Sequence, residues 1–320
     1  MFIDNKWYGN SYIFSKYCKK FNKKIFGSLQ HGLVMIHHFK KSNKKNKSIG
    51  KRRFETIPWF VWSDQIEKRA KLEKSKNVFA IGSPFLYLHS ILSKNFFNKS
   101  NEVLIIPPKS ALEINHNIDY QGITNFLKKK KFKKPFKILV GKSDLKKILR
   151  SKKKFDCKFI TCGDRNDKFY TFKLYRYLKE ASSIVVLYPG TPILYSLFLN
   201  KKTYYYKNRF LISSKRLIFK NHQLNPEGID KKNKYEIDIK LNWFKEYDDL
   251  AVESFKKDFG LNIFKLNNKS SRKKASIALG INKIKSPNEL RNILGWNDPI
   301  KMFLGSFISL LIKFRYSGLR

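Results

Sequence analysis

The stretch IVVLYPGTPILYSLFLN, Ile184 to Asn200, carries the local signals that decide the fold. It opens with a short apolar run, which predicts a buried strand ending at Tyr188. Gly190 permits a tight turn, Thr191 is placed to cap a helix, and Pro192 suits the first helical position. A helix is therefore expected at 192–199, directly after the strand. This strand–turn–helix unit is typical of parallel sheets.

The same alternation recurs on both sides of this stretch. Short apolar segments predict strands at 27–32, 59–62, 78–81, 103–106, 136–140, 158–162 and 203–206. Helices are expected at 8–20, 64–74, 85–92, 119–129, 143–149 and 167–179. Strands alternating with helices imply parallel sheets covered on both faces.

We therefore expect an α/β protein with two doubly wound parallel-sheet domains facing a cleft. The domains are placed at 1–98 and 99–265, and a helical tail at 266–320. In the last part of the tail, 297–320, apolar residues recur at helical spacing with basic residues on either side. Two interpretations stay open for it: a helix lying on anionic lipid, or a helix packed against the first domain.

The charge of the chain is strongly positive: 68 Lys and Arg against 24 Asp and Glu give a formal net charge of +44. A polyanionic partner would explain it. Compositional drift toward Lys, Asn, Ile and Phe would explain it as well, and it is favoured because Lys greatly outnumbers Arg. Three cysteines without a C-x-x-C pair indicate a reducing compartment. No signal peptide, membrane span or metal site is expected.

Ligands of open parallel sheets bind beyond the carboxyl ends of the strands. The candidate binding residues at these ends are Gln30, Gly32, Ser63, Lys109, Ser110, Gly163, Arg165, Gly190 and Thr191. The helix that starts beside Thr191 offers its positive end and a hydroxyl to a phosphate, or it is simply a well-capped helix. His31 is the candidate general base, with a hydrogen-bonded turn histidine as the alternative.

The order of the motifs resembles a known family. It runs WYG at 7–9, QHG at 30–32, IPWFVWS at 57–63, NVFAIGSPFLYL at 77–88, IPPKS at 106–110, TCGDRNDKFY at 161–170 and GT at 190–191. This order is similar to bacterial GT-B glycosyltransferases of capsule and O-antigen loci, which are distantly similar to CDP-glycerol glycerophosphotransferases and bacterial polysialyltransferases. The resemblance spans roughly residues 5 to 210.

The resemblance implies a metal-independent transferase that moves a sugar from a nucleotide-sugar donor to a lipid-linked or growing surface polysaccharide. It makes His31 the base and places Gly190 and Thr191 at the donor phosphate. The first domain would hold the acceptor and the second the nucleotide sugar. Lys109 stands where the family pattern has histidine. No cofactor is implied, and the expected location is cytoplasmic, with an anionic membrane surface at the inner face as a further partner.

Three alternatives stay open. The protein could transfer a polyol phosphate from a CDP-polyol, or it could be a non-catalytic component of a polysaccharide assembly, which the lysine at 109 would fit. A nucleic-acid-binding protein is less favoured, because the charge is its only support and the chain has no recognisable binding motif.

Overall fold

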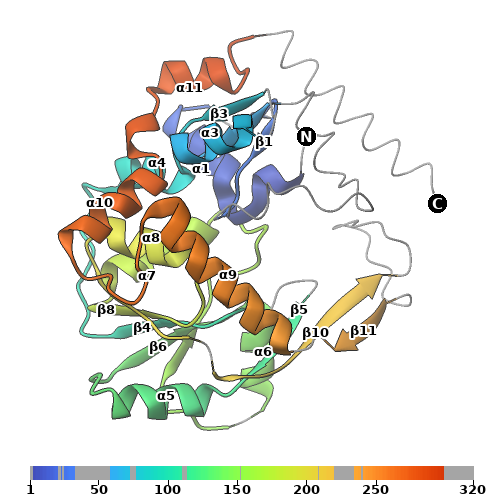
Figure 1. Cartoon of the computed structure of the whole chain (residues 1–320), viewed down its shortest axis with the longest axis vertical. Coiled ribbons are helices and arrows are strands. Elements are labelled where there is room, and N and C mark those ends of the chain that lie inside the picture. The colour runs from blue at the N-terminus through green and yellow to red at the C-terminus, as the bar shows by residue number, and fades with distance from the viewer. Residues whose placement is uncertain are drawn as a thin grey trace.

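The computed structural model describes residues 3–20, 23, 25–32, 58–72, 77–109, 114–151, 153–207, 209–219, 234–238 and 241–298 (Figure 1). The described strands form two parallel sheets, of three and five strands, and one antiparallel sheet of three. The expectation of an α/β protein with parallel sheets is therefore confirmed.

The five-stranded sheet is doubly wound. Its strands are β4 (Val103–Ile106), β6 (Phe136–Leu139), β7 (Lys158–Ile160), β8 (Ser183–Val186) and β9 (Lys202–Tyr205), in the order β7-β6-β4-β8-β9. The helices that lie between these strands in the chain are α5 (Tyr120–Lys129), α6 (Lys142–Arg150), α7 (Tyr170–Glu180) and α8 (Thr191–Phe198).

Side chains alternate along β4 between the two faces of this sheet. Val103 and Ile105 join a buried cluster with residues of α5, whereas Leu104 and Ile106 join the cluster that contains α7 and α8. Figure 1 shows α7 and α8 on one side of the sheet and α5 on the other. Because both faces are covered, the strands are rich in apolar residues, most clearly β4 (VLII) and β8 (SIVV), and this made them predictable.

The strand order reverses between β4 and β8. From β4 the chain moves outward through β6 to β7, and it then returns to the other side of β4 and continues through β8 to β9. In doubly wound sheets the ligand crevice lies at this reversal, beyond the carboxyl ends of the two strands. The segments that begin at Pro107 and Tyr188 leave the sheet at this point.

A smaller parallel sheet precedes this one in the chain. Its strands, in spatial order, are β1 (Ser28–Leu29), β2 (Trp59–Val61) and β3 (Val78–Ala80). The accompanying helices are the 3-10 helix η1 (Ile3–Gly9), α1 (Asn10–Tyr17), α3 (Asp64–Leu72) and α4 (Pro84–Leu92). One buried cluster runs from α1 and α4 to α7 and α8, so this unit packs directly on the second.

An antiparallel sheet was not expected from the sequence. It consists of β5 (Ile114–Ile118), β10 (Leu211–Phe219) and β11 (Lys234–Asp238), in the order β11-β10-β5. In Figure 1 it extends to the side of the five-stranded sheet. The β5 sequence, INHNI, has polar residues at its three central positions and therefore lacks the apolar run that revealed the parallel strands.

The C-terminal helices return to the first unit. They are α9 (Leu241–Phe259), α10 (Lys269–Ala278), the 3-10 helix η4 (Ile281–Lys283) and α11 (Pro287–Ile293). The amide of Ser83 donates to the carbonyl of Leu279 (2.8 Å), and the hydroxyl of Tyr17 donates to that of Lys285 (3.0 Å). The tail therefore contacts the N-terminal unit at Leu279 and Lys285. The helix expected at 297–320 lies outside the described residues apart from its first two.

Candidate functional site

Lys109 lies just beyond the carboxyl end of β4, at the reversal of strand order. Its ammonium group donates to the hydroxyl of Tyr170 (3.0 Å) and lies 5.5 Å from the centroid of that ring. Burial raises the pKa of Tyr170 well above its usual value, so the phenol is neutral. Among the described residues no carboxylate pairs with Lys109, and its positive charge is therefore available to an anion.

The N-terminus of α8 lies on the other side of this reversal. Gly190 is the N-cap and makes no side-chain cap hydrogen bond, while Thr191 and Pro192 are the first two helical residues. The prediction that Thr191 is the N-cap is therefore wrong by one position. A Cβ on Gly190 would lie 2.5 Å from the ring of Tyr188, so this turn requires glycine. The positive end of the helix dipole lies here.

The turn after β1 meets the start of α8. A Cβ built on Gly32 would lie 3.5 Å from Oγ1 of Thr191. At this contact the N-terminal unit reaches the N-terminal end of α8 in the second unit. Residues 159 positions apart in the sequence are thus brought together, and His31 stands immediately beside the contact.

Gln30 holds this turn in place. Its side-chain oxygen accepts from the amide of Trp62 (2.9 Å), and its side-chain nitrogen donates to the carbonyl of Gly32 (2.8 Å). The indole of Trp62 donates to the backbone carbonyl of Gln30 (3.1 Å). Gln30 is buried, and both polar atoms of its side chain make these hydrogen bonds, so it fixes the orientation of the His31–Gly32 turn.

His31 and Arg165 both contact the indole ring of Trp7. The His31 ring is 4.8 Å from the ring of Trp7, centroid to centroid, at an interplanar angle of 53°. The guanidinium carbon of Arg165 lies 4.2 Å from the Trp7 ring, within the range of a cation–π contact. Trp7 therefore joins the candidate base of the first unit to the candidate phosphate-binding arginine of the second.

A bend after Trp7 fastens this segment to the second unit. Tyr8 and Gly9 both have left-handed backbone, with φ of 58° and 74°. The amide of Tyr8 donates to the carbonyl of Arg165 (2.5 Å), and the hydroxyl of Thr171 donates to the carbonyl of Tyr8 (2.5 Å). A Cβ on Gly9 would lie only 2.2 Å from the carbonyl oxygen of Lys168, so the close approach depends on glycine.

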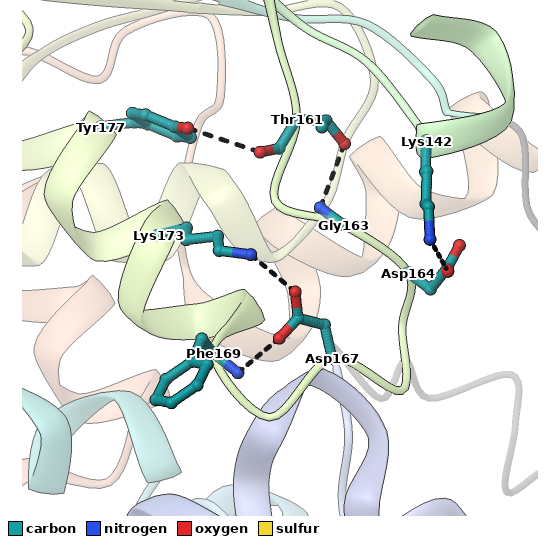
Figure 2. A network of polar contacts seen from close by, with 8 residues as sticks. All are labelled: Lys142, Thr161, Gly163, Asp164, Asp167, Phe169, Lys173 and Tyr177. Atoms are coloured by element: carbon teal, nitrogen blue, oxygen red, sulfur yellow. Dashed lines mark hydrogen bonds and ion pairs between the residues drawn. The ribbon is translucent and has the colours of Figure 1, made fainter. Parts of the chain in front are cut away.

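The loop that carries Arg165 is held by its own polar contacts, as Figure 2 shows. Gly163, at a φ of 93°, donates its amide to the hydroxyl of Thr161 (3.1 Å). Asp167 accepts from the amide of Phe169 (2.8 Å) and the ammonium of Lys173 (2.6 Å). These bonds explain why α7 begins at Tyr170 rather than at the predicted residue 167. Gly163 therefore shapes the loop, and it acts on the candidate site only through the position of Arg165.

Two of the predicted site residues are not joined to this arrangement. Ser63 is buried at 1% exposure, and its hydroxyl has no hydrogen-bond partner in the described part of the chain. No hydrogen bond, ion pair or ring contact of the described residues joins it to His31 or Thr191. Ser110 lies outside the described residues. The structure thus brings together Gln30, His31, Gly32, Arg165 and Thr191, with Lys109 and Gly190 at the adjacent strand ends.

Trp7 is the residue that sequence reasoning missed as part of a site. Its indole N–H is buried without a hydrogen-bond partner among the described residues, and its ring contacts His31 and Arg165. Trp7→Ala is expected to lower the free energy of unfolding by about 2 kcal/mol, because it removes one cation–π and one aromatic contact together with buried apolar area. Trp7→Phe keeps a ring and removes an unpaired donor, so it should recover at least half of this loss. Chemical denaturation measures both, and equal losses in the two variants would contradict the ring-contact account.

The described residues contain no group of three His, Cys, Asp or Glu side chains able to hold a metal ion. None of the described helices combines the length and the apolar character needed to cross a membrane. Compared with known proteins, the chain matches no protein-family model and no curated protein.

Proposed function

We propose that this protein is a metal-independent glycosyltransferase with a GT-B-like arrangement, which moves a sugar from a nucleotide sugar to a lipid-linked or growing surface polysaccharide. The observation that carries the proposal is the approach of Gly32 to Thr191, which brings His31 of one α/β unit to the anion-binding helix end of the other. A donor phosphate at α8 and an acceptor hydroxyl at His31 would then be neighbours.

The proposed reaction assigns a separate task to each group. His31 takes the proton from the acceptor hydroxyl while the acceptor oxygen bonds to the anomeric carbon of the sugar. The bond from that carbon to the phosphate oxygen breaks, and the nucleotide leaves with the bonding electrons. The N-terminus of α8, the Thr191 hydroxyl and the ammonium of Lys109 stabilise the negative charge that develops on the phosphate.

Two features of the fold support the GT-B-like arrangement. Each α/β unit contains a parallel sheet, and the strand order of the larger one reverses between β4 and β8, whose carboxyl ends lead to Lys109 and Thr191. A ligand crevice at such a reversal is the general rule for doubly wound sheets, and it supports the proposal. The chain also crosses back after α10, so that Leu279 bonds to Ser83 of the first unit. We place the protein in the cytoplasm, with the inner face of the plasma membrane as the proposed location of its acceptor.

A ligand screen tests the proposal and separates its closest alternatives. Thermal unfolding is recorded with nucleotide sugars, with CDP-polyols and with the free nucleotides, and a transfer assay with surface-polysaccharide fragments follows for each ligand that stabilises the fold. Stabilisation by a nucleotide sugar, followed by sugar transfer, is expected. Stabilisation by a CDP-polyol alone would support the polyol phosphate transferase, and stabilisation without transfer would support the non-catalytic component.

Thr191→Ala is expected to weaken donor binding ten- to hundredfold, because a hydroxyl hydrogen bond to a charged phosphate is worth about 1.5–3 kcal/mol. Stability should change little, since Gly190 and not Thr191 is the cap residue. Thr191→Ser retains the hydroxyl and serves as the matched control, with donor affinity close to that of the original protein. Titration calorimetry gives both affinities. An unchanged affinity in Thr191→Ala would remove the donor phosphate from this helix end.

A further inference from the structure

The amino edge of the five-stranded sheet, opposite the candidate site, carries a dense basic surface. The sequence KKKKFKK at 128–134 leads from α5 into β6 and contains six lysines in seven residues, all of them exposed. A second exposed basic group, at Lys146, Lys147, Arg150, Lys153, Lys154 and Lys158, runs from the end of α6 into β7. Both groups end at the start of a strand, and parallel strands start at one edge of the sheet.

Contacts between these segments show that they form one continuous surface. Asp156 pairs with both Lys128 and Lys134, which joins the second basic group to the first. The amide of Val103 donates to the carbonyl of Pro135 (3.0 Å), so the start of β4 lies beside the first group. We call the exposed side chains of residues 94–102, 128–134, 146–151 and 153–158 the basic edge.

The carboxylates of the basic edge do not neutralise it. Its two acidic residues are already paired: Glu102 with Lys137, and Asp156 with two lysines. The exposed cations Lys129, Lys131 and Lys133 have no acidic partner among the described residues. Such a concentration of unpaired ammonium groups gives this surface a positive potential.

Lys201, at the end of the turn that leads into β9, is a further cation near the basic edge. Its ammonium group donates to the carbonyls of Lys179 (2.5 Å) and Ala181 (2.7 Å). Burial, and then the nearby charges of Lys179 and Lys99, lower the pKa of Lys201 to about 8. Lys99 belongs to the basic edge, so the positive potential extends to the start of β9.

Two large apolar side chains project from the basic edge. Phe96 is 90% exposed, between Lys94 and Lys99, and Leu149 is 70% exposed, next to Arg150. Exposed apolar side chains among lysines fit a phospholipid surface, where lysines reach anionic headgroups and apolar groups enter the acyl boundary. Sequence-selective nucleic-acid readout relies instead on arginine, asparagine and glutamine contacts to bases, and the basic edge is almost entirely lysine.

We propose that the basic edge docks on an anionic phospholipid bilayer, with Phe96 and Leu149 entering its interface. The inference is independent of the reaction at the candidate site, because it uses the opposite edge of the sheet. It is also independent of the tail at 299–320, which stays unchanged in every variant used below.

Sedimentation with vesicles tests the docking surface on the full chain. The face variant carries Lys129→Glu, Lys131→Glu and Lys133→Glu, and the control variant carries Lys16→Glu, Lys19→Glu and Lys68→Glu, three exposed lysines of the first unit. Both variants change the net charge equally. With vesicles of phosphatidylglycerol and phosphatidylcholine, the partition coefficient of the face variant is expected to fall about 100-fold or more, and that of the control at most a few-fold.

A second experiment changes the two exposed apolar residues and uses the same vesicle assay. Phe96→Ser combined with Leu149→Ser is expected to lower partitioning about tenfold or more at unchanged net charge. Absence of binding to anionic vesicles by the original protein, or equal binding by the face and control variants, would overturn the proposal. So would a face variant that loses binding to duplex DNA while retaining vesicle binding, since the surface would then be a nucleic-acid site. Circular dichroism confirms that each variant is folded.

Discussion

His31→Ala is expected to lower the turnover of sugar transfer by about 10² to 10⁴, the usual contribution of a general base. Nucleotide affinity should stay nearly intact, because the ring of His31 contacts Trp7 and the proposed phosphate site is at α8. The expected result is therefore a fall in kcat with little change in the binding constant for the donor. A transfer assay run beside a nucleotide titration measures the two quantities.

His31→Gln separates proton transfer from packing. Glutamine keeps a polar side chain of similar reach, but it cannot accept a proton near neutral pH. Turnover as low as in His31→Ala is expected. Transfer at the original rate by His31→Gln would show that His31 only shapes the turn, and the assignment of the base would be wrong.

Gly280→Ala is expected to lower the free energy of unfolding by about 3 kcal/mol or more. Gly280 has a φ of 77°, and an added Cβ would lie 1.7 Å from the carbonyl oxygen of Trp62. The positive φ and the clash with the carbonyl oxygen both involve backbone, which cannot rotate away as a side chain can. The returning C-terminal segment would therefore have to move away from β2. Chemical denaturation of the purified variant measures the loss.

Gly260→Ala is the matched control. Its φ of 61° imposes a similar left-handed strain, but the added Cβ would lie 3.5 Å from the flexible end of Lys274. The expected loss is about 1 kcal/mol, the strain alone. Equal losses at the two positions would mean that the close approach to Trp62 contributes nothing to stability.

The strands of the larger sheet could be predicted because burial on both faces requires short runs of apolar residues, which are visible in the local sequence. Val103 to Ile106 is a run of four apolar residues, and the strand has the predicted bounds. The antiparallel sheet could not be predicted in this way. Its β5 pairs with β10 about a hundred residues later, and the polar centre of INHNI shows no burial pattern. Pairing over such distances depends on tertiary context rather than on local sequence.

The candidate site was predictable only at the strand ends. The rule that ligands lie beyond the carboxyl ends of parallel strands singled out His31, Arg165 and Thr191, which the structure places around the Trp7 and Gly32 contacts. The part played by Trp7 depends on two successive left-handed residues, Tyr8 and Gly9. A tyrosine in that conformation has no reliable sequence signal, although the glycine after it is consistent with a tight bend.

A structure of the complex with the nucleotide sugar that gives the largest thermal stabilisation tests whether His31 and Thr191 share one site. The donor phosphates are expected at the N-terminus of α8, within hydrogen-bond distance of the Thr191 hydroxyl, with the sugar directed toward His31. A nucleotide bound away from the reversal between β4 and β8, with Thr191 and His31 both out of contact, would contradict the shared site.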